Sequence, residues 1–102
     1  MKYNKLVRDK IPQIIKQNGQ TAIIHIANSK EYWLKLKEKL AEEVKEFSAD
    51  TSIEEFADVL EVLDAIAVFK NFSKSKVLSV KRKKAKQRGK FKNRIILDET
   101  EK

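Results

Sequence analysis

Apolar residues between positions 29 and 49 repeat at the spacing of one helix face. They stand three or four residues apart and are Trp33, Leu36, Leu40, Val44 and Phe47. This spacing places them on one stripe of an α-helix. Ser29 is a suitable N-cap residue, and the polar cluster Asp50-Thr51-Ser52 interrupts the pattern. We therefore predict a helix over residues 29–49 that buries this stripe.

A second helix is predicted from about residue 53 to residue 70. It begins with a capping box, in which Ser52 is the N-cap residue and Glu55 follows three positions later. Its apolar residues lie on two sides, Ile53, Phe56, Leu60, Leu63 and Ala67 on one and Val62, Ala65, Ile66 and Phe69 on the other. A helix that is apolar on two sides is buried on two sides. We therefore expect a homodimer or a homotetramer that completes the packing.

The remaining elements follow from turn residues and local composition. Ser73 and Gly89 bracket a basic helix over 74–88, and a short helix is expected from Pro12 to Asn18. The β-branched stretch 21–27 predicts a short extended segment, which needs a pairing partner in a second copy or near residues 94–97. Short joints between helices favour antiparallel neighbours. The predicted fold class is all-α, a helical bundle forming one domain over 1–102 and completed by oligomerisation.

Charge is segregated along the chain. The 102 residues carry a formal net charge of +8, but Lys70 to Arg94 contains twelve basic residues and no acidic one, and ten of the fifteen acids fall between Glu38 and Asp64. The basic segment is either a solvated helix face or a binding surface for a nucleic-acid backbone or a phosphate-bearing small ligand. The absence of cysteine excludes disulfides, cysteine-based zinc sites and a thiol nucleophile. With no long apolar run, we expect no membrane association and a cytoplasmic protein.

Several acids lie where the helical pattern expects apolar residues. Glu55 and Asp58 are three residues apart and fall on the same side of their helix as Val62. Glu43 and Glu46 have the same spacing on the preceding helix, where Glu43 borders the apolar stripe. Two antiparallel helices would gather these four carboxylates, which must then protonate or bind cations. Hard oxygen ligands suit Mg²⁺ or Mn²⁺, and the single histidine argues against zinc and against a di-iron site.

The alternative is that these acids are ordinary surface residues. In that case they pair with Lys39, Lys45 or lysines of the basic helix, and acids three residues apart are common on helices. The capping box accounts for Glu55, but it does not account for Asp58.

The acids form part of a longer pattern. Glu42-Glu43-x-x-Glu46 followed by Glu55-x-x-Asp58 resembles the signature of the all-α nucleoside triphosphate pyrophosphohydrolases, the MazG-like superfamily that includes phosphoribosyl-ATP pyrophosphohydrolase. Three further blocks resemble a small single-domain branch of that superfamily in the same order, namely Tyr3–Pro12, Phe56–Val62 and Lys86–Ile95. Two features depart from the pattern. Only eight residues separate Glu46 from Glu55, which requires a tight joint, and the basic helix lacks the acids commonly mixed into it.

The resemblance implies a Mg²⁺-dependent hydrolase. Its substrate would be a standard or nonstandard nucleoside triphosphate, or a related nucleotide, and its products would be the monophosphate and pyrophosphate. It implies that the metal ligands, for Mg²⁺ or alternatively Mn²⁺, are Glu43, Glu46, Glu55 and Asp58. Glu42 would be a helper or water-orienting base. The matching blocks make Arg88 and Arg94 the first candidates for binding substrate phosphates and Lys5 and Arg8 the second.

A rival interpretation from another class also fits the charge pattern. The chain would be a nucleic-acid-binding helical dimer that uses its basic segment 70–94. Phe91 is the one aromatic residue within 81–92, the most basic stretch, and no recognition-helix pattern is visible. The small-molecule nucleotide is therefore the preferred ligand.

Overall fold

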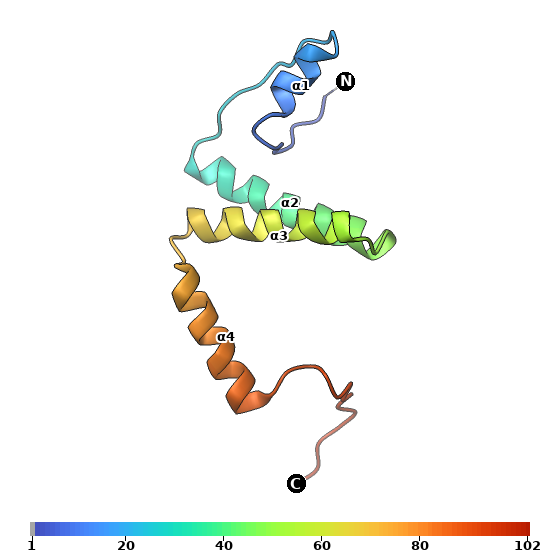
Figure 1. The fold of residues 1–102 in the computed structure, drawn as a ribbon, viewed down its shortest axis with the longest axis vertical. Coiled ribbons are helices and arrows are strands. Elements are labelled where there is room, and N and C mark those ends of the chain that lie inside the picture. The colour runs from blue at the N-terminus through green and yellow to red at the C-terminus, as the bar shows by residue number, and fades with distance from the viewer. Residues whose placement is uncertain (1) are drawn as a thin grey trace. The chain divides into compact units, whose positions relative to one another are not determined.

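The computed structural model describes residues 2–102, which form four helices and no strand (Figure 1). The helices are α1 (Ile11–Gln17), α2 (Ser29–Ala49), α3 (Ile53–Phe69) and α4 (Lys74–Arg88). The all-α class is therefore confirmed. Within the described residues, no helix combines the length and the apolar character that crossing a membrane requires.

The segment 21–27 does not form a strand. It lies outside regular secondary structure, and Ile23 and Ile26 are 96% and 88% exposed. β-Branched residues favour strands through packing against a neighbouring strand, and no other segment of residues 2–102 offers one. Pairing of this segment with residues 94–97 or with a second copy stays a prediction.

The chain divides into two compact units, Met1–Ala67 and Val68–Lys102. The first contains α1, α2 and nearly all of α3, and the second contains α4 and the segment that follows it. The single domain over 1–102 and the oligomer both stay predictions.

In the first unit, α2 and α3 are joined by the three residues 50–52. The Asp50 amide donates a hydrogen bond to the Glu46 carbonyl at 2.9 Å and closes α2, while the Ser52 hydroxyl accepts the Glu55 amide at 3.2 Å and opens α3. The rings of Phe47 and Phe56 pack across this joint with centroids 5.7 Å apart. The tight joint expected from the short acidic spacing is therefore present, and it sets α2 and α3 side by side.

The N-cap of α2 differs from the prediction by one residue. Asn28, not Ser29, has extended backbone, and its side chain accepts the Glu31 amide at 2.9 Å. Asn and Ser cap helices equally well. The extended backbone at Asn28 therefore decides which of the two residues is the N-cap.

The buried side of α2 is rotated relative to the predicted stripe. Leu36 is 1% exposed and Glu43 is buried, whereas Val44 is 46% exposed. Seven residues make almost two helical turns, so Glu43 lies within about 20° of Leu36, and Val44 lies about 80° away. The expectation that Val44 belongs to the core is therefore wrong, and a carboxylate takes that place.

On α3, the side that faces α2 carries the acids. Val62 is buried, and Glu55 and Asp58 are half-buried on the same side, as predicted. The other apolar side is open, with Ile53 83% and Phe56 51% exposed.

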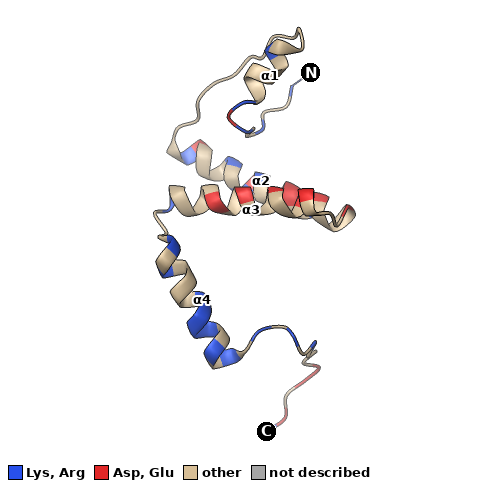
Figure 2. Ribbon diagram, in the orientation of Figure 1, with Lys and Arg blue, Asp and Glu red and all other residues tan. Residues whose placement is uncertain are grey.

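In the second unit, α4 is a solvated basic helix. The Ser73 hydroxyl caps it by accepting the Lys76 amide at 3.1 Å, as predicted. Gly89 ends the helix at φ 81° and ψ −175°, a conformation that is open to glycine and differs from the αL state common at helix ends. Every residue of α4 except Ala85 is exposed, and Lys and Arg run along the helix with no acid among them (Figure 2).

Candidate metal centre

The carboxylates of α2 and α3 meet in two groups that share Glu43. The inner cluster consists of Glu43, Glu55 and Asp58, and the outer cluster consists of Glu42, Glu43 and Glu46. Within each cluster, one carboxylate oxygen of every residue lies within 4.8 Å of the others. Oxygen ligands at these separations can contact a single divalent cation after small side-chain movements. Of the four predicted metal ligands, the structure thus brings Glu43, Glu55 and Asp58 together in one cluster, and Glu46 lies with Glu43 in the other.

Two oxygens of the inner cluster are buried without a partner. Oε2 of Glu43 and Oε2 of Glu55 are shielded from solvent and have no hydrogen-bond partner among the described residues. The whole Glu43 side chain is only 9% exposed. A buried carboxylate oxygen that makes no hydrogen bond is costly, and neighbouring negative charges add to that cost. A cation bound among these carboxylates would offset that cost, so the inner cluster could hold a metal ion.

The Glu55 side chain takes no part in a capping box. Ser52 accepts the Glu55 amide, but the Ser52 amide itself donates to the Asp50 carbonyl at 2.9 Å. The reciprocal bond from the Glu55 side chain, which would complete the box, is not made within the described chain. The Glu55 carboxylate is therefore available to a ligand.

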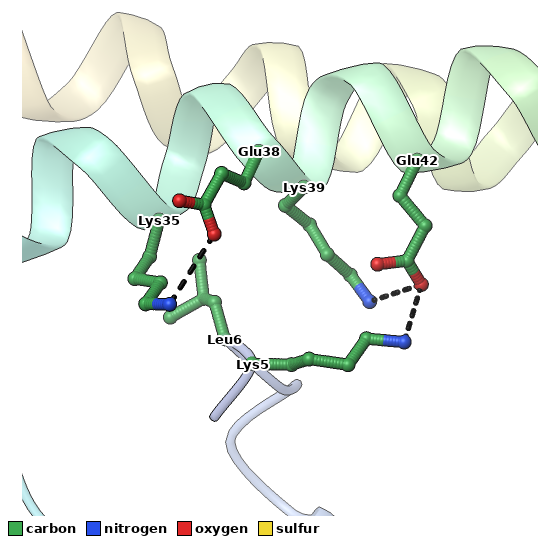
Figure 3. Close-up of a pocket in the computed structure, with 6 residues that line it drawn as sticks. All are labelled: Lys5, Leu6, Lys35, Glu38, Lys39 and Glu42. Atoms are coloured by element: carbon green, nitrogen blue, oxygen red, sulfur yellow. Dashed lines mark hydrogen bonds and ion pairs between the residues drawn. The ribbon is translucent and has the colours of Figure 1, made fainter. Parts of the chain in front are cut away.

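Lysine pairing accounts for part of the acidic charge, as the surface alternative predicts. Lys39 Nζ lies 3.3 Å from Glu43 Oε1 and 3.6 Å from Glu42 Oε1. Figure 3 shows Lys39 and Lys5 converging on the same Glu42 oxygen. These pairs engage the outer cluster and one oxygen of Glu43. They leave the two buried Oε2 atoms unpaired.

The N-terminal arm, residues 2–10, supplies two more cations to the clusters. Lys5 Nζ lies 2.8 Å from Glu42 Oε1, and the Arg8 guanidinium donates to Asp58 Oδ1 at 2.7 Å. A second Arg8 nitrogen lies 3.8 Å from Glu61. The sequence marked Lys5 and Arg8 as phosphate-binding candidates. It did not indicate that their partners here would be acids of the two clusters.

The surroundings of Glu42, Glu46 and Glu55 shift the pKa values of these three carboxyl groups. The charge of Glu43 raises the pKa of Glu46, and desolvation followed by the charge of Asp58 raises the pKa of Glu55. The hydrogen bond from Lys5 lowers the pKa of Glu42 and raises that of Lys5 itself. Glu46 and Glu55, which lie beside other carboxylates, therefore resist ionisation.

Replacing Glu55 by Gln should stabilise the metal-free protein at neutral pH. A carboxyl whose folded-state pKa is raised favours folding while it is protonated, and that contribution is lost as the pH rises through the raised pKa. Gln is neutral throughout, so Glu55→Gln should match the wild type at acidic pH and melt at a higher temperature near pH 7.5 in EDTA. Added Mg²⁺ should raise the melting temperature of the wild type only. A lower melting temperature for Glu55→Gln in EDTA at neutral pH would contradict this electrostatic picture.

Arg88 and Arg94, the first-choice phosphate ligands, belong to the second unit. They lie at either end of the turn that follows α4, around a hollow of about 390 Å³ lined by residues 88–96. Arg94 has φ 57°, in the left-handed region. In the first unit, the hollow beside Lys5 and Glu42 has a volume of only about 30 Å³, which is too small for a nucleotide.

Comparisons with known proteins add one partial match. No family model matches the chain. An uncharacterized protein of Mycolicibacterium smegmatis (strain ATCC 700084 / mc(2)155) is 48% identical over 48 residues, which cover 46% of this chain and 49% of that protein. The match therefore spans about half the length of this curated relative. No solved structure matches the chain.

Proposed function

We propose that the protein is a Mg²⁺-dependent nucleotide pyrophosphohydrolase. Its substrate would be a standard or nonstandard nucleoside triphosphate, or a related nucleotide. Hydrolysis would yield the monophosphate and pyrophosphate. The observation that carries the proposal is the inner cluster, where Glu43 and Glu55 each bury an unpartnered carboxylate oxygen beside Asp58. The order of the matching sequence blocks supports the choice of reaction.

In this proposal, acidic residues bind the metal and basic residues bind the substrate phosphates. Glu43, Glu46, Glu55 and Asp58 would hold the metal, because they provide hard oxygen ligands in two groups that share Glu43. The bound cation would neutralise charge on the phosphates and lower the pKa of a coordinated water. Lys5 lies beside Glu42 and Arg8 lies beside Asp58, and both would bind phosphate oxygens of the substrate. Arg88 and Arg94 remain candidates for the same role.

Glu42 is the candidate for orienting the attacking water. Its carboxylate is held ionised by Lys5 and Lys39, so it can accept a hydrogen bond from water without first losing a proton. With its lowered pKa, it is suited to positioning the water more than to taking its proton. No protein nucleophile is required, in keeping with the absence of cysteine.

A panel of nucleotides tests the proposal. Standard and nonstandard nucleoside triphosphates, with Mg²⁺, are followed by ³¹P NMR, which separates cleavage to monophosphate and pyrophosphate from loss of the terminal phosphate. We expect equal amounts of monophosphate and pyrophosphate from at least one member of the panel, and no product when EDTA replaces Mg²⁺. Cleavage that persists in EDTA, or release of the terminal phosphate alone, would refute the proposed reaction.

The exposure of α4 favours one alternative, binding to a nucleic acid. Its side chains are open to solvent, and basic residues line it without an acid among them. Such a helix can neutralise backbone phosphates, and binding should then weaken with about one power of salt concentration for each phosphate contacted. A panel without turnover, together with salt-sensitive binding of RNA or DNA, would favour this alternative.

A further inference from the structure

The N-terminal arm places its cations on residues of both acidic clusters. Lys5 pairs with Glu42 of the outer cluster at 2.8 Å, and Arg8 pairs with Asp58 of the inner cluster at 2.7 Å. Fifty positions separate Arg8 from Asp58 in the sequence, so the pair is a tertiary contact and not a consequence of chain proximity. The arm therefore acts as a set of counterions for the clusters.

Arg8 and a metal ion compete for Asp58. The guanidinium donates to Oδ1 of Asp58, the same side chain that supplies an oxygen to the inner cluster. A divalent cation at the inner cluster would share this carboxylate with Arg8, and the two positive charges would repel each other. The Arg8 side chain is 56% exposed, and exposed ion pairs stabilise a fold only slightly. Arg8 can therefore leave Asp58 at little cost.

A polyphosphate resolves this competition. It brings negative charge to the metal, and its oxygens can accept two hydrogen bonds from the guanidinium, which in their absence makes one hydrogen bond to Asp58 and lies 3.8 Å from Glu61. We infer that Arg8 exchanges partners, pairing with Asp58 in the free protein and with the phosphate chain once a metal–polyphosphate binds. This inference rests on the proposed function and makes Arg8 a substrate-binding residue that also opposes the binding of metal alone.

If Arg8 exchanges Asp58 for phosphate, removing its charge should strengthen the binding of metal alone and weaken the binding of polyphosphate. Arg8→Gln should bind Mn²⁺ alone about fivefold more tightly, because a competing charge is removed. The same variant should bind inorganic tripolyphosphate in the presence of Mg²⁺ about 10- to 100-fold more weakly, because charge-assisted hydrogen bonds are lost. Tripolyphosphate carries the phosphate chain without a base, so the unknown base does not affect the result.

Two further variants isolate the role of Arg8. Lys10→Gln removes an equal charge from the same arm, two residues away, and should change both affinities by less than about twofold. Arg8→Lys keeps the charge but loses the paired geometry, so its Mn²⁺ affinity should match that of the wild type while tripolyphosphate binding falls to an intermediate value. If Arg8→Gln lacks the helical circular dichroism of the wild type, Arg8→Lys carries the test.

Titration calorimetry measures both affinities for the full chain and the three variants. Opposite shifts in Arg8→Gln, absent in Lys10→Gln, would establish the exchange. Unchanged tripolyphosphate binding in Arg8→Gln or Arg8→Lys, or shifts equal to those of Lys10→Gln, would overturn it. A wild-type chain that binds no Mn²⁺ would instead refute the metal site itself, so the two failures are distinguishable.

Discussion

Glu43→Gln is expected to abolish nucleotide hydrolysis while leaving the helices intact. Glu43 belongs to both acidic clusters, and its side chain is the most buried of the acids in them. Gln has nearly the same shape but lacks the charge that holds a divalent cation. Loss of a residue that merely orients a metal ligand costs about 10- to 100-fold, so loss of this shared ligand should cost about 100-fold or more.

The matched control for this variant is Glu54→Gln. Glu54 lies in the first turn of α3, next to Glu55 in the sequence, but it is exposed and belongs to neither cluster. It should retain wild-type turnover and Mg²⁺ dependence. Pyrophosphate release is measured for both variants at saturating Mg²⁺, with circular dichroism to check folding. If Glu43→Gln keeps at least half of the wild-type rate, the assignment of Glu43 as a ligand is wrong.

Leu36→Ala is expected to have the largest effect on stability. Leu36 is 1% exposed, and Val62 is the other buried apolar residue among those described. Truncating a fully buried leucine costs about 2–5 kcal/mol, against a total stability of about 5–15 kcal/mol for a typical domain. Because Leu36 and Glu43 share a side of α2, the same change should also loosen the inner cluster.

Leu34→Ala on the same helix provides the control. Leu34 is 49% exposed, so the identical truncation removes a side chain that is already half in water and should cost less than about 1.5 kcal/mol. Urea unfolding followed by circular dichroism gives both values, with EDTA present so that metal binding does not contribute. Equal losses in the two variants would show that Leu36 is not the centre of the core.

The features that the sequence predicted correctly depend on local chemistry. The helix over 29–49 follows from a spacing of three and four residues, and the Ser73 cap and the short joint at 50–52 follow from residues next to one another in the chain. The side of α3 that carries Glu55 and Asp58 follows from helical geometry alone. Each of these depends on interactions within about one or two helical turns.

The features that the sequence missed depend on distant parts of the chain. Val44 lies on the predicted apolar stripe and Glu43 borders it, and the position of α3 decides which of them is buried. The Arg8–Asp58 pair depends on how the arm returns to the bundle, which no local pattern specifies. Segment 21–27 has strand-forming residues but no partner strand in the described chain. The sequence did contain one indication of the contacts made by the N-terminal arm. Lys5 and Arg8 lie in the block Tyr3–Pro12, which accompanies the acids in the pattern of the resembled superfamily.

We propose the inner cluster as a divalent-cation site, and direct Mn²⁺ binding tests this claim. Electron paramagnetic resonance detects free Mn²⁺, so its signal falls when the protein binds the ion. We expect the wild-type chain, without nucleotide, to reduce the free Mn²⁺ signal in proportion to its concentration, and Glu43→Gln to leave it nearly unchanged. Equal free Mn²⁺ in the two samples would contradict the claim.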